Sequence, residues 1–386
     1  MHKTSKILIV TTVPETIKVF MRPFLKLLKE VGFDVHIATG YGCDLGFLKD
    51  MNIVEHRLPL NRSINPFKDI LALFKLLQIC RKEKFDLIHT HTLKASLVGQ
   101  IAAKISGIKR RIITAHGTVY SNSLPFVTRK LILISEKVST RFSTKLWVLN
   151  SEDYDFYKNM IKVNPNKIEI LSKGGIGVDL EVYKPNLLDD FQIKDYKEKI
   201  GIPIQNVVIS FVGRLVRDKG CYELIQAWEK IESKFTDATL LIITPKMVSE
   251  RENELVCRHN FSHLKNIVIL ENRNDMPQLY NCMDILVLPS YREGFSRVII
   301  EAMASGILVI ASDVKGCRDA ILDGETGILI KPRDVNDLFN KLSEALLFRD
   351  NMYKIGDAAR DYSLQNFDHH KINQHILRTY NEILGN

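Results

Sequence analysis

The chain has 386 residues, of which 45% are apolar and 26% charged, and its formal net charge is +9. This is the composition of an ordinary soluble globular protein, and the length predicts two domains, each with its own core. No apolar run approaches the roughly 20 residues that cross a membrane, and Ile7–Val10 is too short for the core of a signal peptide. The six cysteines include no C-x-x-C pair, which argues against a zinc module. We therefore expect a cytoplasmic protein without membrane-spanning helices.

The positive charge is concentrated before Pro185. That part contains 29 Lys and Arg and 16 Asp and Glu, a net charge of +13, so the remainder carries −4 of the total of +9. A basic half suits nucleic acid or an anionic membrane surface, and scattered, solvated lysines would also explain it. Because we find no zinc module, helix-turn-helix signature or motif of interleaved aromatic and basic residues, we expect no nucleic-acid partner. An anionic membrane surface that carries a lipid diphosphate is the more specific expectation.

The first elements alternate between strand and helix. Lys6–Thr12 is predicted as a strand, Phe20–Val31 as an amphipathic helix that ends at Gly32, and Asp34–Ala38 as the next strand. This β-α-β order predicts a Rossmann-like half. The loop after the first strand contains no glycine and the G-x-G-x-x-G fingerprint is absent, which argues against a dinucleotide ligand.

Two histidines lie at the end of a later strand. A long helix, Pro66–Lys82, leads to the segment Asp86–Thr92, which contains His89 and His91. Side chains two residues apart on a strand point to the same side, so a metal site must be considered. A third ligand is not evident nearby, and we therefore expect a polar network at the strand end and no bound metal.

A further histidine ends the following strand. Arg111–Ala115 is predicted as a strand, and His116 and Gly117 come directly after it. A His at the carboxyl end of a parallel strand is accessible to ligands, and glycine allows a ligand to approach the backbone closely. The alternative is a structural His whose hydrogen bonds are satisfied within the protein.

The segment Asn122–Leu146 predicts a basic amphipathic helix. Basic residues alternate there with Leu, Ile, Val and Phe, which places apolar residues on one face. The basic residues are Arg129, Lys130, Lys137, Arg141 and Lys145. Their face either contacts anionic lipid headgroups or is merely solvated.

The second half repeats the alternation of strand and helix after a polar stretch, Pro185–Pro203, which we interpret as a linker with a short helix. Six predicted strands indicate a second parallel sheet. They are Val207–Val212, Thr239–Ile243, Asn266–Leu270, Ile285–Leu288, Ile307–Ala311 and Gly327–Ile330. The closing helices are predicted at Val335–Leu347 and Lys371–Leu384.

The stretch Asp284–Gly306 is the most informative part of the chain. An inner strand is followed by a loop with Glu293 and by a helix with Glu301, and Ser296 lies where a helix cap is expected. Ligands of parallel α/β sheets bind at the carboxyl ends of the strands, and a helix N-terminus favours an anion. Two carboxylates beside an anion-binding helix N-terminus suit a ligand with hydroxyls and phosphates, such as a nucleotide sugar. Two solvated helix-end carboxylates are the alternative.

The second half of the chain contains two spaced motifs, Gly213-Arg214-x4-Lys219-Gly220 and Pro289-Ser290-x2-Glu293-Gly294-Phe295-x5-Glu301. Together they resemble family 4 glycosyltransferases, which are retaining enzymes of the GT-B fold. The segment Lys173–Asp179 is similar to the Gly-(Val/Ile)-Asp segment of that family, and the resemblance covers nearly the whole chain. The chain departs from the glycine-rich turns of the family at Thr11–Thr16 and Thr244–Lys246. The resemblance is strongest to bacterial enzymes that build capsule, exopolysaccharide or lipid-linked oligosaccharide.

The resemblance implies two Rossmann-like domains that face each other across a cleft. Residues 1–184 would bind the acceptor, residues 185–368 would bind the nucleotide sugar, and residues 369–386 would form a helix that crosses back to the first domain. The implied nucleotide-sugar contacts are Arg214, Lys219, Arg273, Asn274, Glu293, Gly294, Phe295, Ser296 and Glu301. The implied catalytic residues are His116, Glu293, Arg214 and Lys219.

The resemblance also implies a role for each group. Arg214 and Lys219 would hold the diphosphate, so that no divalent metal is needed. Glu301 would accept hydrogen bonds from the ribose hydroxyls, while Glu293 and the backbone of Gly294–Ser296 would meet the hexose. Arg273 and Asn274 would lie against the base, and His116 would lie near the reacting side of the sugar.

The expected activity is transfer of a hexose or N-acetylhexosamine, with retention, from a nucleotide sugar that we expect to be a UDP-sugar. The expected acceptor is a saccharide linked to polyprenyl diphosphate at the cytoplasmic face of the membrane, where the protein would bind peripherally. Three alternatives remain open at this point: a GT-B nucleotide-sugar epimerase, a glycosyltransferase with a soluble acceptor, and a non-catalytic binding protein. The complete Arg-Lys-Glu-Glu set argues against the last of these.

Overall fold

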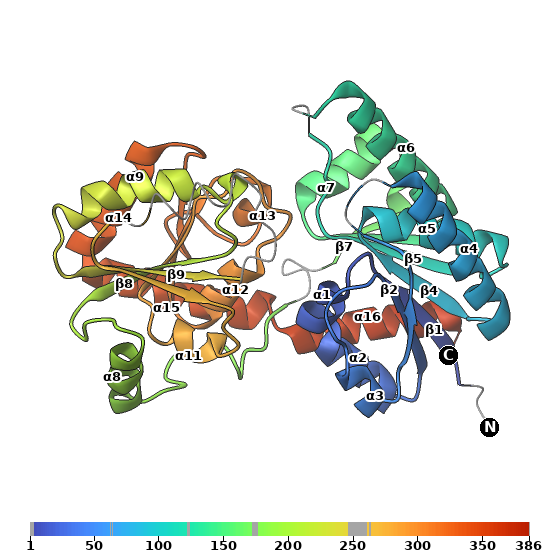
Figure 1. The fold of residues 1–386 in the computed structure, drawn as a ribbon, viewed down its shortest axis with the longest axis horizontal. Coiled ribbons are helices and arrows are strands. Elements are labelled where there is room, and N and C mark those ends of the chain that lie inside the picture. Colours follow the sequence, from blue (N-terminus) through green and yellow to red (C-terminus); the bar gives the residue numbers. More distant parts are fainter. Residues whose placement is uncertain are drawn as a thin grey trace. The chain divides into compact units, whose positions relative to one another are not determined.

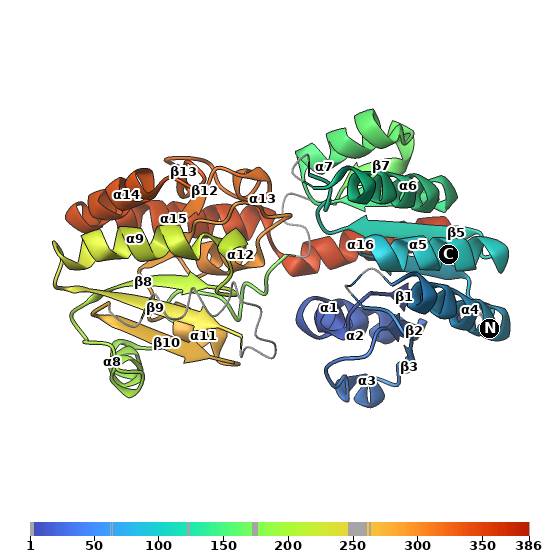
Figure 2. The same ribbon diagram turned by 45° about the horizontal axis from the view of Figure 1, so that its top comes forward.

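The computed structural model describes residues 4–61, 63, 65–121, 124–171, 177–245, 261 and 264–385. The chain divides into two compact units. Unit 1 comprises residues 1–171 and 371–386, and unit 2 comprises residues 172–370. Each unit is a parallel sheet with helices on both faces, as Figures 1 and 2 show. This is the predicted architecture of two Rossmann-like domains, here called units 1 and 2.

The sheet of unit 1 has seven parallel strands in the order β3-β2-β1-β4-β5-β6-β7. The strands are β1 Lys6–Val10, β2 Asp34–Thr39, β3 Val54–Arg57, β4 Leu87–His91, β5 Arg110–Ala115, β6 Lys145–Val148 and β7 Ile168–Ile170. Almost every residue of β1, β2, β4 and the second half of β5 is buried, as expected for strands covered on both faces. The strand order reverses between β1 and β4, which marks the carboxyl ends of these strands as the expected ligand side.

Helices cover both faces of this sheet. On one face α4 (Pro66–Glu83), α5 (Leu93–Ile105) and α6 (Phe126–Phe142) lie side by side (Figure 1). On the other face lie α2 (Arg22–Glu30) and the final helix α16 (His369–Leu384), whose Tyr380 is buried beside Phe24. The remaining short helices described in unit 1 are α1 Pro14–Thr16, a π-helix at Ile17–Met21, α3 Phe47–Asp50, α7 Ser151–Asp155, a second π-helix at Phe156–Ile161 and a 3₁₀ helix at Pro165–Lys167.

The sheet of unit 2 has six parallel strands in the order β10-β9-β8-β11-β12-β13. The strands are β8 Val207–Val212, β9 Ala238–Thr244, β10 Ile267–Glu271, β11 Ile285–Leu288, β12 Leu308–Ser312 and β13 Ile328–Ile330. All six agree with the predicted strands to within a residue at each end. The order reverses between β8 and β11, the strands that carry the two motifs.

Two apolar cores lie on the two faces of this second sheet. One is formed with α9 (Cys221–Glu232) and α14 (Val335–Leu347), and the other with α11 (Met276–Tyr280), α12 (Arg297–Ala304) and α15 (Arg349–Asn366). The remaining helices described in unit 2 are α8 Asp190–Lys199, α13 Lys315–Arg318 and a 3₁₀ helix at Arg217–Lys219. Helix α8 begins with the capping box of Asp189 and Gln192 inside the predicted linker.

The units divide at other residues than the expected boundary at 184/185. Backbone groups of the segment from Val178 to Lys184 are hydrogen-bonded to residues in and just after α15, so this segment belongs to unit 2. The Val178 N–H donates to the Phe367 carbonyl at 2.8 Å, and the Arg360 guanidinium donates to the Tyr183 carbonyl at 2.9 Å. Residues 173–176 of the predicted glycine-rich segment, and Lys246 of the turn after β9, lie outside the described residues.

The predicted helix Asn122–Leu146 is shorter than expected. Helix α6 begins at Phe126, with Pro125 at its N-cap position, and ends at Phe142 because Ser143 is extended and Lys145 starts β6. The prediction for Phe20–Val31 was wrong at its start, since the chain forms α1 and a π-helix before α2 begins at Arg22. Asn122 lies outside the described residues.

Candidate functional site

The loop after β8 is held against the loop after β11. The Gly213 N–H donates to the Ile243 carbonyl of β9 at 2.9 Å, and Leu215 is buried. A short 3₁₀ turn, Arg217–Lys219, leads to Gly220 with φ +72°. A Cβ at Gly220 would lie 2.0 Å from the Pro289 carbonyl oxygen, so only glycine permits this approach. The two motifs therefore meet at the carboxyl ends of β8 and β11.

An ion pair joins the two motifs. Lys219 Nζ lies 2.5 Å from Glu293 Oε1, and the two side chains are 24% and 11% exposed. Arg214 is exposed and makes no ion pair with any other described residue. The pair thus places a cation and a carboxylate from distant positions in the sequence at the ligand side of the sheet. The loop that carries Lys219 also carries a second cation, Arg214.

The backbone around Glu293 is fixed by a third loop. The Gly316 N–H donates to the Glu293 carbonyl at 3.3 Å, and a Cβ at Gly316 would lie 2.4 Å from the Gly294 carbonyl oxygen. Phe295 packs edge-on against Phe367 at 6.2 Å between ring centroids. Because both contacts are close, the loop Glu293–Phe295 has little room to change its backbone.

Glu301 lies within a buried polar cluster on α12. It is 7% exposed, and its carboxylate accepts from Arg297 Nε at 2.6 Å and from the Tyr280 hydroxyl at 3.1 Å. Tyr183 also hydrogen-bonds Glu301, and burial together with this carboxylate raises the pKa of Tyr183. Arg297 and Glu301 are one helical turn apart, which is the favourable spacing for such a pair. The carboxylate is therefore held in a fixed orientation.

Ser296 lies at the predicted cap position, but its side chain does not cap the helix. It occupies the N-cap position of α12, but its side chain makes no capping hydrogen bond, and it is 5% exposed. The backbone N–H groups at this helix start are therefore not satisfied by that hydroxyl.

The loop after β10 contains a second ion-pair network. Arg273 Nε donates to Asp275 Oδ1 at 2.8 Å, and the Arg273 guanidinium also donates to the Tyr196 hydroxyl at 2.9 Å. Arg273 lowers the pKa of Asp275 to about 2, while burial and Asp275 raise the pKa of Tyr196 to about 12. The Arg273 guanidinium is thus engaged within the protein, and its neighbour Asn274 is exposed.

In unit 1, two histidines meet at the carboxyl ends of β4 and β5. His91 Nδ1 lies 2.9 Å from His116 Nε2, and His91 Nε2 is buried without a hydrogen-bond partner among the described residues. Burial lowers the pKa of His116 to about 4 and that of His91 well below its ordinary value. Both rings are therefore neutral near pH 7, and a single proton lies between them.

His89 ties the same strand to the last helix. Its Nδ1 lies 2.6 Å from the Tyr380 hydroxyl and its Nε2 lies 2.7 Å from Thr114 Oγ1. The expected polar network at this strand end is confirmed, and burial lowers the pKa of His89 to about 3. Within the described ranges no group of three or more His, Cys, Asp or Glu side chains is placed to hold a metal ion.

Sequence reasoning missed two contacts at these strand ends. His91 was expected in a polar network at the end of its strand, but its contact with His116 was not predicted. Thr92 has φ 73° and ψ 152°, a conformation that is strained for a β-branched residue, and its hydroxyl lies 2.6 Å from that of Thr12. The Thr residues at the ends of β1 and β2 were the only sequence signal for such hydroxyl contacts.

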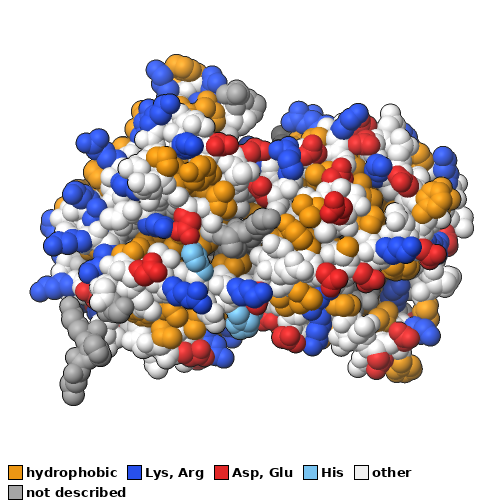
Figure 3. Space-filling model, turned by 180° about the vertical axis from the view of Figure 1, so that it is seen from behind, with side chains coloured by type: hydrophobic (Ala, Val, Ile, Leu, Met, Phe, Trp, Pro, Cys, Tyr) orange, Lys and Arg blue, Asp and Glu red, His pale blue; other side chains and the backbone are white. Residues whose placement is uncertain are grey.

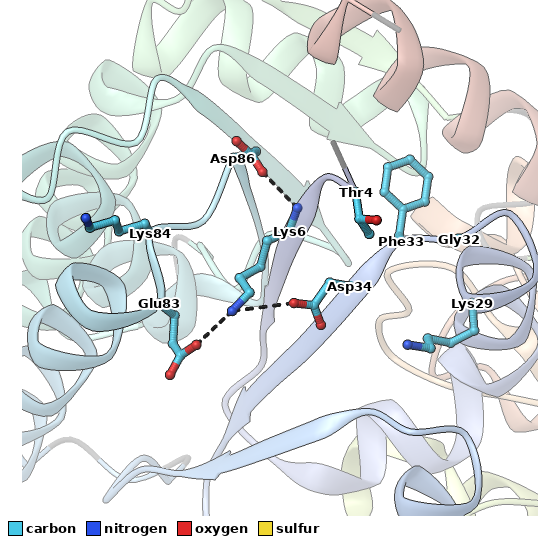
Figure 4. Close-up of a pocket in the computed structure, with 9 residues that line it drawn as sticks. All are labelled: Thr4, Lys6, Lys29, Gly32, Phe33, Asp34, Glu83, Lys84 and Asp86. Atoms are coloured by element: carbon cyan, nitrogen blue, oxygen red, sulfur yellow. Dashed lines mark hydrogen bonds and ion pairs between the residues drawn. The ribbon is translucent and has the colours of Figure 1, made fainter. Parts of the chain in front are cut away.

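A cavity of about 630 Å³ lies at the opposite end of the strands of this sheet, where β1, β2 and β4 begin. Figure 4 shows Lys6 between Glu83 and Asp34, with Nζ 2.8 Å and 3.4 Å from their carboxylates. The charges of Lys6, Glu83 and Asp34 are thus paired with one another. The amino ends of the strands are also not the side at which parallel sheets bind ligands. We therefore do not consider it the active site.

Two family models match the chain in sequence order. Residues 6–149 match the model described as "Glycosyl transferase 4-like", and residues 206–347 match the model described as "Glycosyl transferases group 1". None of the helices described is long and apolar enough to cross a membrane.

Similar proteins are found among both sequences and solved structures. The capsular polysaccharide biosynthesis glycosyltransferase CapM of Staphylococcus aureus is 30% identical over 387 residues, covering 99% of this chain and 98% of CapM. The UDP-Gal:alpha-D-GlcNAc-diphosphoundecaprenol alpha-1,3-galactosyltransferase of Escherichia coli is 28% identical and covers 82% and 81%. The crystal structure of a glycosyltransferase from Rickettsia africae matches the fold with a TM-score of 0.83, 24% identity and full coverage of both chains. Since both halves match family models and a relative is similar over its full length, the chain belongs to the family 4 glycosyltransferases, with the GT-B fold.

Proposed function

We propose that the protein transfers a hexose or N-acetylhexosamine, with retention of configuration, from a UDP-sugar to a saccharide linked to polyprenyl diphosphate. The observation that carries this proposal is the Lys219–Glu293 pair at the switch point between β8 and β11. A cation and a carboxylate in contact there can separate to bind a diphosphate and a sugar hydroxyl respectively. Neither group alone would recognise both parts of a nucleotide sugar.

The donor is assigned to unit 2 as follows. Arg214 and Lys219 bind the diphosphate and stabilise the charge that develops on the leaving UDP, so no metal is required. Glu301, oriented by Arg297 and Tyr280, accepts hydrogen bonds from the ribose hydroxyls. Glu293 and the backbone of Gly294–Ser296 bind the transferred sugar. The exposed Asn274, with Arg273 beside it, lies against the base.

The reaction we propose is a front-face displacement. The bond from the anomeric carbon to the UDP oxygen breaks, and a bond to the acceptor hydroxyl oxygen forms on the same face. The hydroxyl proton passes to the departing diphosphate oxygen, so that charge is balanced. His116, neutral and bonded to His91, is assigned to the reacting side of the sugar, where it can donate or accept one hydrogen bond.

The lipid-linked acceptor is supported by two observations. The similar galactosyltransferase of Escherichia coli acts, by its name, on a GlcNAc-diphosphoundecaprenol. Unit 1 carries most of the excess of Lys and Arg, and Figure 3 shows blue side chains spread over its surface. We therefore infer peripheral binding to an anionic membrane at its cytoplasmic face.

The proposal is tested by incubating the purified full-length chain with UDP-Gal, UDP-Glc, UDP-GlcNAc, UDP-GalNAc and GDP-Man, each with a polyprenyl-diphosphate saccharide. We expect one UDP-sugar to be consumed, with a mass increase of one residue on the lipid-linked acceptor, and equal rates with and without EDTA. Proton NMR of the product gives the anomeric configuration. Activity that EDTA removes and Mn²⁺ restores would refute the role of Arg214 and Lys219. Conversion of the donor to its epimer without acceptor, or transfer only to a soluble sugar, would refute the acceptor assignment.

A further inference from the structure

A second hollow in unit 1 is lined by basic residues from two segments. It has a volume of about 340 Å³, at the lower end of the range of ligand pockets. The last two turns of α6 form one wall, and the chain that follows the second π-helix forms the other. The residues that line it are Lys137, Thr140, Arg141, Ile161, Lys162, Val163, Asn164 and Lys167.

The four cations of this pocket have no carboxylate partner. No carboxylate lines the hollow, and within the described residues none of the four forms an ion pair. The nearby carboxylates are engaged elsewhere. Glu136 is buried and hydrogen-bonded to Tyr157, and Glu169 is held by Lys145 and His375. The positive charge of the pocket is therefore left uncompensated by the protein.

The backbone that presents these cations is well fixed. Thr140, Ile161 and Val163 are buried and form the floor. Lys167 Nζ donates to the Ser143 carbonyl at 3.0 Å, which ties the second segment to the end of α6. Lys162 is the C-cap residue of the second π-helix, with φ 64°, and its N–H donates to the Tyr157 carbonyl. The backbone on both sides of the hollow is therefore held by hydrogen bonds within the protein.

We propose that this pocket binds a phosphate-bearing anion. A phosphate or diphosphate presents several acceptor oxygens to Arg and Lys donors at once, and its negative charge offsets the mutual repulsion of the cations. Two sources share this chemistry: a free diphosphate, and the headgroup of an anionic phospholipid. The inference does not depend on the proposed donor site, whose cations belong to unit 2.

The exposed side chains of α6 favour the lipid headgroup. Leu131 and Ile134 are 49% and 56% exposed, and Lys130, Ile134, Lys137 and Arg141 follow one another at helical spacing on one face. An apolar stretch that leads into a basic pocket matches the order of acyl chain and phosphate at a membrane surface. This part of the inference rests on the proposed membrane-bound function.

The first test uses the unmodified full-length protein. Its lysines are acetylated with an amine-reactive reagent, with and without inorganic pyrophosphate, and the peptides are quantified by mass spectrometry. We expect at least fivefold protection of Lys137, Lys162 and Lys167, and none of Lys26, Lys49, Lys68 and Lys82, which are exposed on other helices of unit 1. Protection of Lys219 reports the proposed donor site separately, so failure at one site is distinguishable from failure at the other.

The second test uses vesicles of phosphatidylglycerol and phosphatidylcholine, compared with vesicles of phosphatidylcholine alone. The pocket variant replaces Lys137, Arg141, Lys162 and Lys167 by Gln, and the control variant replaces Lys26, Lys49, Lys68 and Lys82 by Gln. We expect the pocket variant to lose at least tenfold in binding to anionic vesicles and the control less than threefold. Transfer to a detergent-dispersed acceptor should be unchanged in both.

Each outcome decides between sources or rejects the site. Protection by pyrophosphate alone identifies a free-diphosphate site, and loss of vesicle binding specific to the pocket variant identifies a headgroup site. If pyrophosphate protects no pocket lysine and the two variants bind vesicles alike, the proposal is wrong and the cations are a solvated surface. The labelling of the unmodified chain remains decisive even if the pocket variant fails to fold.

Discussion

Lys219 and Glu293 neutralise one another in an ion pair. Their contact of 2.5 Å lies at the carboxyl ends of two strands, and only 24% and 11% of the two side chains are exposed. An ion pair with so little exposure costs more to break when one partner is removed than its net contribution suggests. Each residue therefore maintains the other in a defined position.

Replacing Lys219 by Ala should nearly abolish transfer. A charge-assisted contact with the leaving diphosphate contributes about 2–4 kcal/mol in the transition state, so kcat/KM should fall about 10²- to 10³-fold. The matched control is Lys194→Ala, an exposed lysine on α8, which should retain full activity. Steady-state kinetics and a thermal melt of both variants make the comparison. If Lys219→Ala keeps more than half of the wild-type turnover, Lys219 is not in the site.

The buried histidines should make the stability of unit 1 depend on pH. Burial lowers the pKa of His89 to about 3 and that of His116 to about 4, so the unfolded chain binds protons below pH 6.5 that the folded chain does not. The free energy of unfolding is therefore highest, as far as these two histidines are concerned, above pH 6.5. It decreases as the pH falls from 6.5 towards the pKa values of the folded chain. Each such His contributes a slope of up to about 1.4 kcal/mol per pH unit.

His89→Gln should remove one part of this slope. The variant loses stability at pH 8, because the bonds to Tyr380 and Thr114 are weakened, but the difference from the wild type should shrink between pH 6.5 and 5. Tyr380→Phe is the control, since it breaks the same contact and leaves the titrating ring in place. Denaturant unfolding at several pH values measures both. Parallel pH curves for the wild type and His89→Gln would contradict the depressed pKa.

At the scale of elements, strands were easier to predict than helices. The four inner strands of unit 2, β8, β9, β11 and β12, are short apolar runs that are buried on both faces, and such runs are recognisable without knowledge of their neighbours. Helix α5 was not predicted because residues such as Ala95, Val98 and Ala102 are buried between the sheet and α4 and α6, which leaves no polar face to reveal the period. The π-helix before α2 likewise has no pattern of its own.

The sequence predicted which residues belong to the candidate site but not which side chains they contact. The spacing of the two motifs placed Lys219 and Glu293 at strand ends, yet their direct contact depends on how closely Gly220 approaches Pro289. The partners of Glu301, which include Tyr183 and Tyr280, come from other segments of unit 2 that no motif marks. Side-chain contacts between distant segments require the folded backbone.

Helix α6 offers an apolar surface whose role can be tested. Phe126, Val127, Leu131 and Ile134 are between 49% and 67% exposed, and Figure 3 shows hydrophobic and basic side chains together over the start of this helix. The double variant Leu131→Glu/Ile134→Glu should bind anionic vesicles at least tenfold more weakly, because two side chains no longer enter the headgroup layer. Phe191→Glu on α8, 79% exposed, is the control. Equal binding of all three proteins in a sedimentation assay would show that α6 is simply solvated.

Arg129 is a poor choice for testing this surface. Its side chain is partly buried and its Nε has no hydrogen-bond partner among the described residues. Charge reversal there would place a carboxylate in a site that already lacks a partner, and the variant would lose stability. Lys130 and Lys137, which are exposed, are the cations of this helix that can be changed without that complication.

At the scale of the whole molecule, the last helix belongs to the first unit. Arg110 donates to the Ile383 carbonyl at 2.7 Å, and Tyr380 is buried against Phe24 and Trp147. Tyr380→Ala should therefore lower the stability of unit 1 by about 3–5 kcal/mol, the usual cost of deleting a buried aromatic ring. Tyr380→Phe, which loses only the hydroxyl, should cost about 1 kcal/mol. Calorimetry should show the transition of unit 1 shifted and that of unit 2 unchanged; a shift of both would mean that the units unfold together.

The return of α16 to unit 1 has a consequence for synthesis on the ribosome. Unit 2 is one continuous segment, residues 172–370, and it can reach its final structure as soon as that segment has emerged. Most of unit 1 is translated before unit 2, but the part of its sheet that receives Tyr380 stays uncovered until α16 has left the ribosome. A nascent chain that stalls before α16 has emerged therefore exposes this apolar part of unit 1 to chaperones.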